Sequence, residues 1–104
     1  MTALHWETTG GPYIVKAFQA LSDDTRQRIL HLLESRDSNV GEIVSGCNLT
    51  QPAISRHLKV LHNADLVTRR RDGARVIYSI NGEVLGELLP QFFGRFSGCD
   101  EFLK

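Results

Sequence analysis

The side chains best suited to binding chemistry lie on two neighbouring segments between residues 50 and 75. In residues 51–63, short polar and cationic side chains recur at helical spacing: Gln51, Ser55, Arg56 and Lys59. A helix that enters the DNA major groove needs such side chains on its exposed N-terminal half, where they hydrogen-bond to base edges. Thr50 is a good N-cap and Pro52 is tolerated in a first turn. We expect two parts of this helix to contact backbone phosphates: the N–H groups at its start, and His62 near its end.

The second segment is an arginine-rich hairpin. Two β-type runs, 66–71 and 74–80, flank the dipeptide Asp72-Gly73, which suits the positive φ angles of a two-residue turn. An arginine run can also be a solvated sheet edge that discourages aggregation. The alternative is a surface that reaches phosphates or a minor groove with the four guanidinium groups around the turn: Arg69, Arg70, Arg71 and Arg75.

The distribution of charge favours the nucleic-acid interpretation, although the total does not. The 104 residues carry 12 Lys+Arg and 12 Asp+Glu, so the formal net charge is zero. Binding to phosphate requires clustered cations, and a zero total argues against it. Residues 54–79, however, hold six basic and two acidic side chains, a net charge of +4. Residues 1–53 and 80–104 each carry −2, so a basic block lies between two acidic ones.

The elements that must position these side chains are helices joined to one hairpin. A chain of 104 residues is one domain by length. Apolar periodicity predicts helices over 13–21, 23–35, 40–45, 51–63 and 84–96. We expect Gly46 to end the third in a left-handed conformation, and Pro90 to kink or split the last. The expected fold class is mostly α with a β-hairpin wing: a winged helix-turn-helix over 13–96, between a flexible arm (1–12) and a C-terminal tail (97–104).

Three stretches resemble the ArsR/SmtB family of dimeric bacterial transcriptional repressors. They are LSDDTRQRIL at 21–30, TQPAISRHLKVL at 50–61, and ADLV at 64–67 followed by the arginine-rich hairpin. The family usually has Gly where this chain has Asp65, and Asp adopts the left-handed conformation of that position at some cost. The resemblance covers about residues 13–96.

The resemblance implies a homodimer built from the first and last helices. Both helices carry an apolar stripe that a two-fold partner would bury, although the stripes could instead pack within one chain. A two-fold dimer places its recognition helices roughly 34–36 Å apart, which suits a near-palindromic operator. The expected dimerisation residues are Tyr13, Ile14, Ala17, Phe18, Leu85, Leu88, Leu89, Phe92, Phe93 and Phe96.

The resemblance also raises the question of sensing, because such repressors often release DNA on binding a metal or metalloid. The thiols of one family site would fall at residues 39–41, which contain no cysteine. The last helix offers Glu83 and Glu87 without a histidine, which disfavours a zinc site. Cys47 and Cys99 remain as a possible thiol sensor through a soft metal or metalloid, a disulfide or a persulfide. They could equally be a small buried residue and an idle thiol.

The remaining function classes find no support in the sequence. No apolar run approaches the 18 or so residues of a membrane span, and no secretory signal is visible, so we expect a cytoplasmic protein. No nucleophile–base pair or Gly-rich phosphate loop suggests an enzyme. We predict a homodimeric DNA-binding repressor with double-stranded DNA and a second copy of itself as partners. A winged-helix protein-interaction module and a constitutive repressor without an inducer remain as alternatives.

Overall fold

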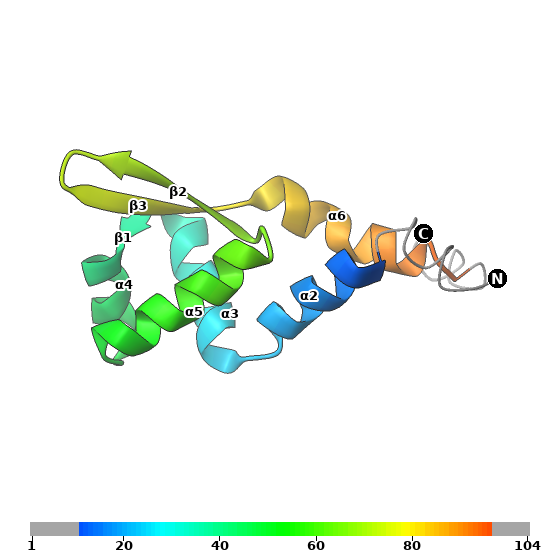
Figure 1. Cartoon of the computed structure of the whole chain (residues 1–104), viewed down its shortest axis with the longest axis horizontal. Helices are drawn as coiled ribbons and strands as arrows, with labels where there is room; N and C mark the ends of the chain where they lie inside the picture. Colours follow the sequence, from blue (N-terminus) through cyan, green and yellow to red (C-terminus); the bar gives the residue numbers. More distant parts are fainter. Residues whose placement is uncertain (1–10, 97–104) are drawn as a thin grey trace.

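The computed structural model describes residues 11–96, and the predicted fold class is confirmed over this range (Figure 1). The helix predicted for 13–21 begins two residues earlier, because Gly11 and Pro12 belong to its first turn. The predicted arm, apart from these two residues, lies outside the described residues, as do the tail and Cys99. The elements are α2 (Gly11–Leu21), α3 (Asp24–Ser35), β1 (Ser38–Asn39), α4 (Val40–Cys47), α5 (Gln51–Asn63), β2 (Val67–Asp72), β3 (Arg75–Ile80) and α6 (Gly82–Phe93).

The sheet has one strand more than the sequence predicted. Its order is β1-β3-β2, all antiparallel, so the two-residue β1 adds to the hairpin through the pair Ser38↔Tyr78. A strand of two residues has no periodicity, so the sequence pattern does not predict it. Ser38 is nevertheless buried, and its hydroxyl donates to the Arg36 carbonyl at 3.2 Å.

The hairpin turn lies one residue later than predicted. Asp72 and Arg75 are the last paired residues, so the loop is Gly73-Ala74 rather than Asp72-Gly73. Gly73 has φ +65, and no non-glycine residue of the loop has a positive φ. A turn with positive φ at the first central position only is type II′, which places Gly first.

Helix α4 is also longer than predicted. It passes through Gly46 and ends at Cys47, and the left-handed residue is Asn48, with φ 54 and ψ 40. Gly46 serves a different purpose, since a Cβ built there would lie 2.8 Å from Leu32 Cδ1 on α3. The missing side chain therefore lets α4 approach α3 closely.

Helix α6 runs continuously from Gly82 to Phe93 with Pro90 inside it, so the chain is not split into two helices there. Asn81 caps its start by accepting a hydrogen bond from the Val84 N–H at 3.3 Å. The helix ends three residues before the predicted Phe96. After it, the Gly94 N–H donates to the Pro90 carbonyl at 2.8 Å.

The core is centred where α3, α4 and α5 meet the sheet, and it extends to α2 and α6, which lie side by side toward the other end of the molecule (Figure 1). Fully burying one Val, Leu or Ile side chain contributes about 1.5–3 kcal/mol to the stability of the fold. The largest fully buried side chains are Ile29, Leu33, Ile43, Ile54, Leu58, Leu61, Leu66 and Val67.

Candidate nucleic-acid interface

Helix α5, called the recognition helix below, has the bounds and the cap that the sequence predicted. Thr50 Oγ1 accepts a hydrogen bond from the Ala53 N–H at 3.4 Å. Ile54, Leu58 and Leu61 are at most 1% exposed, so one face of the helix is fixed in the core. The candidate DNA-binding residues on the other side are exposed, except for the half-buried His62: Thr50, Gln51, Pro52, Ser55, Arg56 and Lys59.

The end of the recognition helix is set by Asp65, which has φ 61 as the sequence predicted. The Leu66 N–H donates to the Leu61 carbonyl and the Asp65 N–H to the His62 carbonyl, both at 3.0 Å. This is a Schellman motif with Asp in place of the usual Gly. It turns the chain directly from the recognition helix into β2.

A polar cluster that sequence reasoning missed joins the recognition helix to the α2–α3 corner. Arg26 donates through Nε to the Ala20 carbonyl at 2.6 Å and lies 3.2 Å, through Nη1, from His57 Nδ1. Asp23 caps α3, and its carboxylate lies 3.6 Å from the same His57 nitrogen. These contacts fix the rotation of α5 about its axis. Because Arg26 and His57 are 31 positions apart, no local pattern signals the contact.

The wing, defined as β2, β3 and the turn between them, separates its arginines onto two faces. Cross-strand pairing places Arg69 opposite Tyr78 and Arg71 opposite Val76, on the face that Val67 shares. Arg70 lies on the other face, opposite Ile77. The Arg69, Arg71, Val76 and Tyr78 positions on the first face, together with Arg70 between them in the strand, line a surface groove of about 430 Å³.

Arg70 differs from the other wing arginines in its contacts. Its Nη1 lies 3.0 Å from Asp37 Oδ2, in the loop between α3 and β1, and 3.2 Å from Ser79 Oγ on β3. The Ser79 hydroxyl and the Arg70 guanidinium hold the pKa of the Asp37 carboxyl below its usual value. Among residues 11–96, neither the Arg69 nor the Arg71 guanidinium has a hydrogen-bonding or ion-pair partner.

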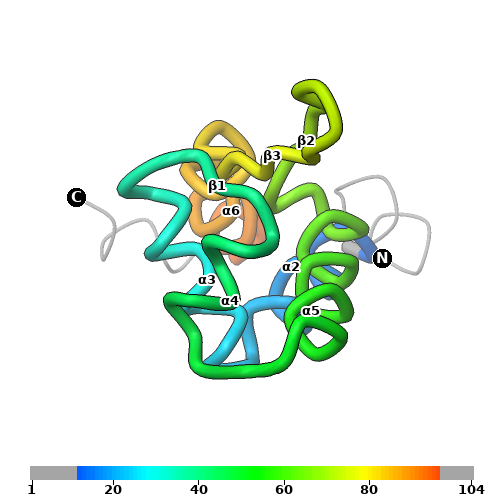
Figure 2. Tube along the Cα trace, turned by 90° about the vertical axis from the view of Figure 1, so that its left-hand side faces the viewer, coloured from blue at the N-terminus to red at the C-terminus, as the bar shows by residue number. Residues whose placement is uncertain are grey.

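The recognition helix and the wing, joined where α5 passes into β2, extend toward the same end of the molecule. The wing tip points toward the end where α5 begins (Figure 1), and both lie on the same side in the end-on view (Figure 2). The arrangement presents the polar face of a rigid helix beside a cationic hairpin. Such a surface can contact base edges and phosphates at once. The exposed cations that contribute to it are Arg56, Lys59, Arg69, Arg70, Arg71 and Arg75.

The predicted dimerisation residues fall into two groups. Phe18 of α2 and Phe92 of α6 contact each other edge-to-face with ring centroids 5.1 Å apart, so part of both stripes packs within the chain. Ile14, Ala17 and Leu88 are at most 3% exposed and cannot offer surface to a partner, which corrects the prediction for these three. Leu89 and Phe96 remain 52% and 49% exposed. The half-buried members are Tyr13, Phe18, Leu85, Phe92 and Phe93.

The candidate thiol sensor has one member in the structure. Cys47 is buried at the end of α4, and burial raises the pKa of its thiol, opposed in part by Arg28. A raised pKa lowers the thiolate fraction that metal binding and oxidation require. Within residues 11–96, no three His, Cys, Asp or Glu side chains gather to form a metal site. In the same range, no helix is long and apolar enough to cross a membrane.

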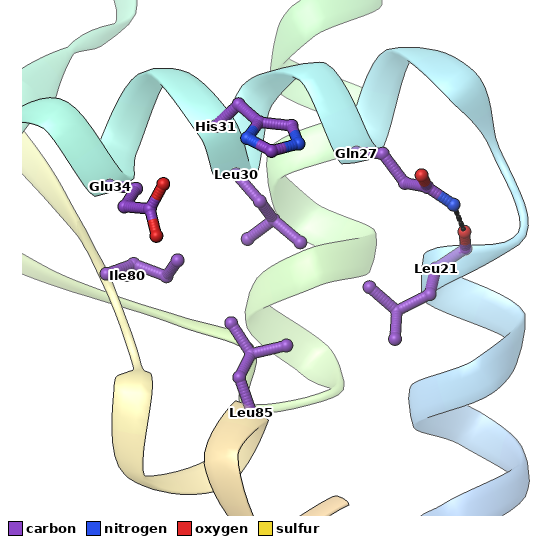
Figure 3. A pocket seen from close by; sticks show the side chains of 7 residues that line it. All are labelled: Leu21, Gln27, Leu30, His31, Glu34, Ile80 and Leu85. Carbon is purple, nitrogen blue, oxygen red and sulfur yellow. Dashed lines mark hydrogen bonds between the residues drawn. The ribbon is translucent and has the colours of Figure 1, made fainter. Parts of the chain in front are cut away.

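A pocket of about 300 Å³ lies away from the cationic surface, where α2, α3, β3 and α6 meet (Figure 3). Leu21, Leu30, Ile80 and Leu85 give it an apolar floor, and neither Lys nor Arg lines it. Gln27 closes one side by donating from Nε2 to the Leu21 carbonyl at 2.7 Å. The pocket is therefore not part of a phosphate-binding surface.

Comparison with known proteins gives consistent matches. Residues 23–69 match the family model described as bacterial regulatory protein, arsR family. The transcriptional repressor SdpR of Bacillus subtilis (strain 168) is 41% identical over 68 residues, covering 65% of this chain and 76% of the repressor. An arsenical resistance operon repressor of Staphylococcus aureus is 33% identical over 69 residues, 66% of either chain.

Solved structures agree with the fold. An ArsR-like transcriptional regulator from Rhodococcus sp. RHA1 superposes with a TM-score of 0.78 at 26% identity, covering 88% of this chain and 87% of the regulator. The homodimeric winged helix-turn-helix DNA-binding domain of a possible ArsR-family regulator from Mycobacterium bovis superposes with a TM-score of 0.73. It is 27% identical and covers 86% of this chain and 85% of that domain.

Proposed function

The chain belongs to the ArsR family of bacterial regulatory proteins, and on this premise we propose that it is a homodimeric transcriptional repressor. It binds DNA with the recognition helix in the major groove and the wing against the backbone or minor groove. The observation that carries the proposal is the two-faced recognition helix: one face is fixed in the core, and the other exposes Gln51, Ser55 and Arg56 beside a cationic hairpin.

The side chains divide by role. Gln51, Ser55 and Arg56 lie on the N-terminal half of the recognition helix and contact base edges, since amide and guanidinium groups form the bidentate pairs that distinguish bases. Lys59 and His62 lie further along and contact phosphate. Arg69, Arg71 and Arg75 of the wing contribute backbone contacts that do not depend on sequence.

Self-association uses the apolar surface that α2 and α6 leave uncovered. Val15, Leu89 and Phe96 are 42–52% exposed, and an exposed apolar patch on a small protein marks an interaction surface. The homodimeric relative from Mycobacterium bovis supports the same assembly. A two-fold dimer presents two recognition helices to two half-sites about one DNA turn apart.

The proposed activity is regulatory rather than catalytic, which the family relationship supports. The arsenical resistance relative supports the alternative of a metal- or metalloid-responsive repressor, with Cys47 and Cys99 as the available thiols. Burial raises the pKa of the Cys47 thiol, and the smaller thiolate fraction favours a repressor that does not sense through this thiol.

Binding to the DNA upstream of the protein's own gene tests the proposal. Fluorescence anisotropy at increasing salt should give saturable binding whose affinity falls steeply, because cations on the protein displace counterions from phosphate. Light scattering on the free protein should give twice the chain mass. An isotherm that is insensitive to salt, or no binding at all, contradicts DNA binding and favours a protein-interaction module.

Sensing is tested separately. Operator affinity is compared for reduced protein, oxidised protein, and the variants Cys47→Ser and Cys99→Ser, each with and without arsenite. Equal affinities throughout indicate a constitutive repressor. If oxidation or arsenite lowers the operator affinity of the wild type, and neither serine variant shows this loss, the protein is a thiol sensor.

A further inference from the structure

Arg70 is placed differently from the other exposed cations of the wing, because an acidic side chain from another element neutralises it. Asp37 immediately precedes β1, whose Ser38 pairs with Tyr78 on the central strand β3. This register places Asp37 beside Ser79, and Arg70 reaches across β3 from the edge strand β2 to both.

Asp37 has no second cation to pair with among the described residues. Arg36, the cation next to Asp37 in sequence, is itself paired with Glu42 at 2.6 Å. Within the described part of the chain, Arg70 is the cation that Asp37 contacts. The pKa of Asp37 is lowered from a usual value that is already acidic, so the carboxylate is charged at neutral pH. The pair therefore removes one positive charge from the wing in the free protein.

The Asp37–Arg70 ion pair is exposed enough for Arg70 to exchange Asp37 for another anion. The side chains of Arg70 and Asp37 are 58% and 46% exposed, and ion pairs in contact with water contribute little to stability. The six-residue ladder between β2 and β3 already holds the hairpin without it. A DNA phosphate offers Arg70 an equivalent, bidentate anionic partner.

We infer that Asp37 is a positioning residue that competes with DNA phosphate for Arg70 and thereby lowers the affinity of the wing for DNA. Arg70 binds phosphate only by leaving Asp37, whereas Arg69 and Arg71 bind it without losing a partner. This inference rests on the proposed function, because it requires a wing that lies against DNA.

The test is a double-mutant cycle in DNA affinity. Wild type, Asp37→Asn, Arg70→Gln and the double variant are titrated with one operator over a range of salt concentrations. Asp37→Asn should bind up to about tenfold more tightly at low salt, with a salt slope steeper by up to about one unit, since one more cation is free to displace counterions. In the Arg70→Gln background, the same substitution should change the affinity much less.

Asp72→Asn is the matched control. Asp72 is an exposed carboxylate at the end of β2 that makes no hydrogen bond or ion pair with another described residue. Removing the Asp72 charge reduces the general repulsion between the protein and DNA. The resulting gain in DNA affinity should be equal with and without Arg70. A gain for Asp37→Asn that also persists without Arg70 overturns the inference, as does unchanged or weaker binding by Asp37→Asn. If the wild type itself shows no salt-dependent binding, the proposed function fails.

Discussion

The recognition helix and the wing carry the same kind of cationic side chain, but the molecule holds them in place differently. Along α5, three apolar side chains are at most 1% exposed, and the Asp23–Arg26–His57 cluster fixes the helix from the side. In β2 only Val67 is buried, and the strand beyond it is exposed. A rigidly held helix suits contacts that depend on base identity, while a loosely covered hairpin suits contacts to a uniform backbone.

The largest expected effect contrasts packing in the two regions. Leu58→Ala in the recognition helix should lower the free energy of unfolding by about 2–5 kcal/mol, because it leaves a cavity in the core. Val76→Ala in the wing removes a half-buried side chain and should cost well under half as much. Chemical denaturation measures both. Equal losses would mean that the wing is held by packing as firmly as the helix.

The next effect concerns sequence preference. Arg56→Ala should weaken operator binding by about 1–3 kcal/mol and leave binding to unrelated DNA much less changed, since a lost base contact affects only the specific complex. Competition between operator and random-sequence DNA measures the ratio. Lys59→Ala on the same helix is the control, and it should weaken both complexes alike. An unchanged ratio for Arg56→Ala would remove this residue from base recognition.

Within the wing, Arg71 and Arg70 should differ. Arg71→Gln should weaken binding to all DNA and reduce the salt slope by about one unit, because one phosphate contact is lost. Arg70→Gln should reduce it less, since Arg70 must first leave Asp37. Salt titrations with a single DNA compare the two. Identical slopes would mean that Asp37 does not restrain Arg70.

The smallest effect lies at the junction of the two regions. Asp65→Gly should stabilise the protein by up to about 1 kcal/mol, because the left-handed conformation strains Asp but not Gly, and the greater entropy of the unfolded glycine chain offsets part of the gain. Thermal unfolding at neutral pH measures the change. Asp65→Ala should be destabilised, since Ala adopts this conformation less readily than Asp.

The recognition helix was predictable because its signals are local. Thr50 marks its start, Pro52 its first turn, and the spacing of Ile54, Leu58 and Leu61 its buried face. Asp65 was predicted to end it through its place in the family pattern. The turn and the end of α4 were each misplaced by one or two residues, because Gly73 and Gly46 fit more than one backbone role. Only the packed structure shows that Gly46 leaves room for Leu32.

Contacts between distant residues were not predictable. Strand β1 is two residues long and exists because β3 lies beside it. Ile14, Ala17 and Leu88 satisfy the pattern of an exposed apolar stripe, but they are buried by the rest of the same chain. Periodicity shows which side of a helix is apolar, and it does not show which partner covers that side.

By itself, the sequence determined the helices, the hairpin, the winged helix-turn-helix class and the basic block at 54–79 within a neutral chain. Capping, periodicity and composition act over a few residues and can be read directly. The tertiary structure alone decided how that block is used. It placed Arg69 and Arg71 on one face of the wing and brought Asp37 to Arg70, 33 positions away. The pairing of charges depends on distance in space, which follows from the register of three strands.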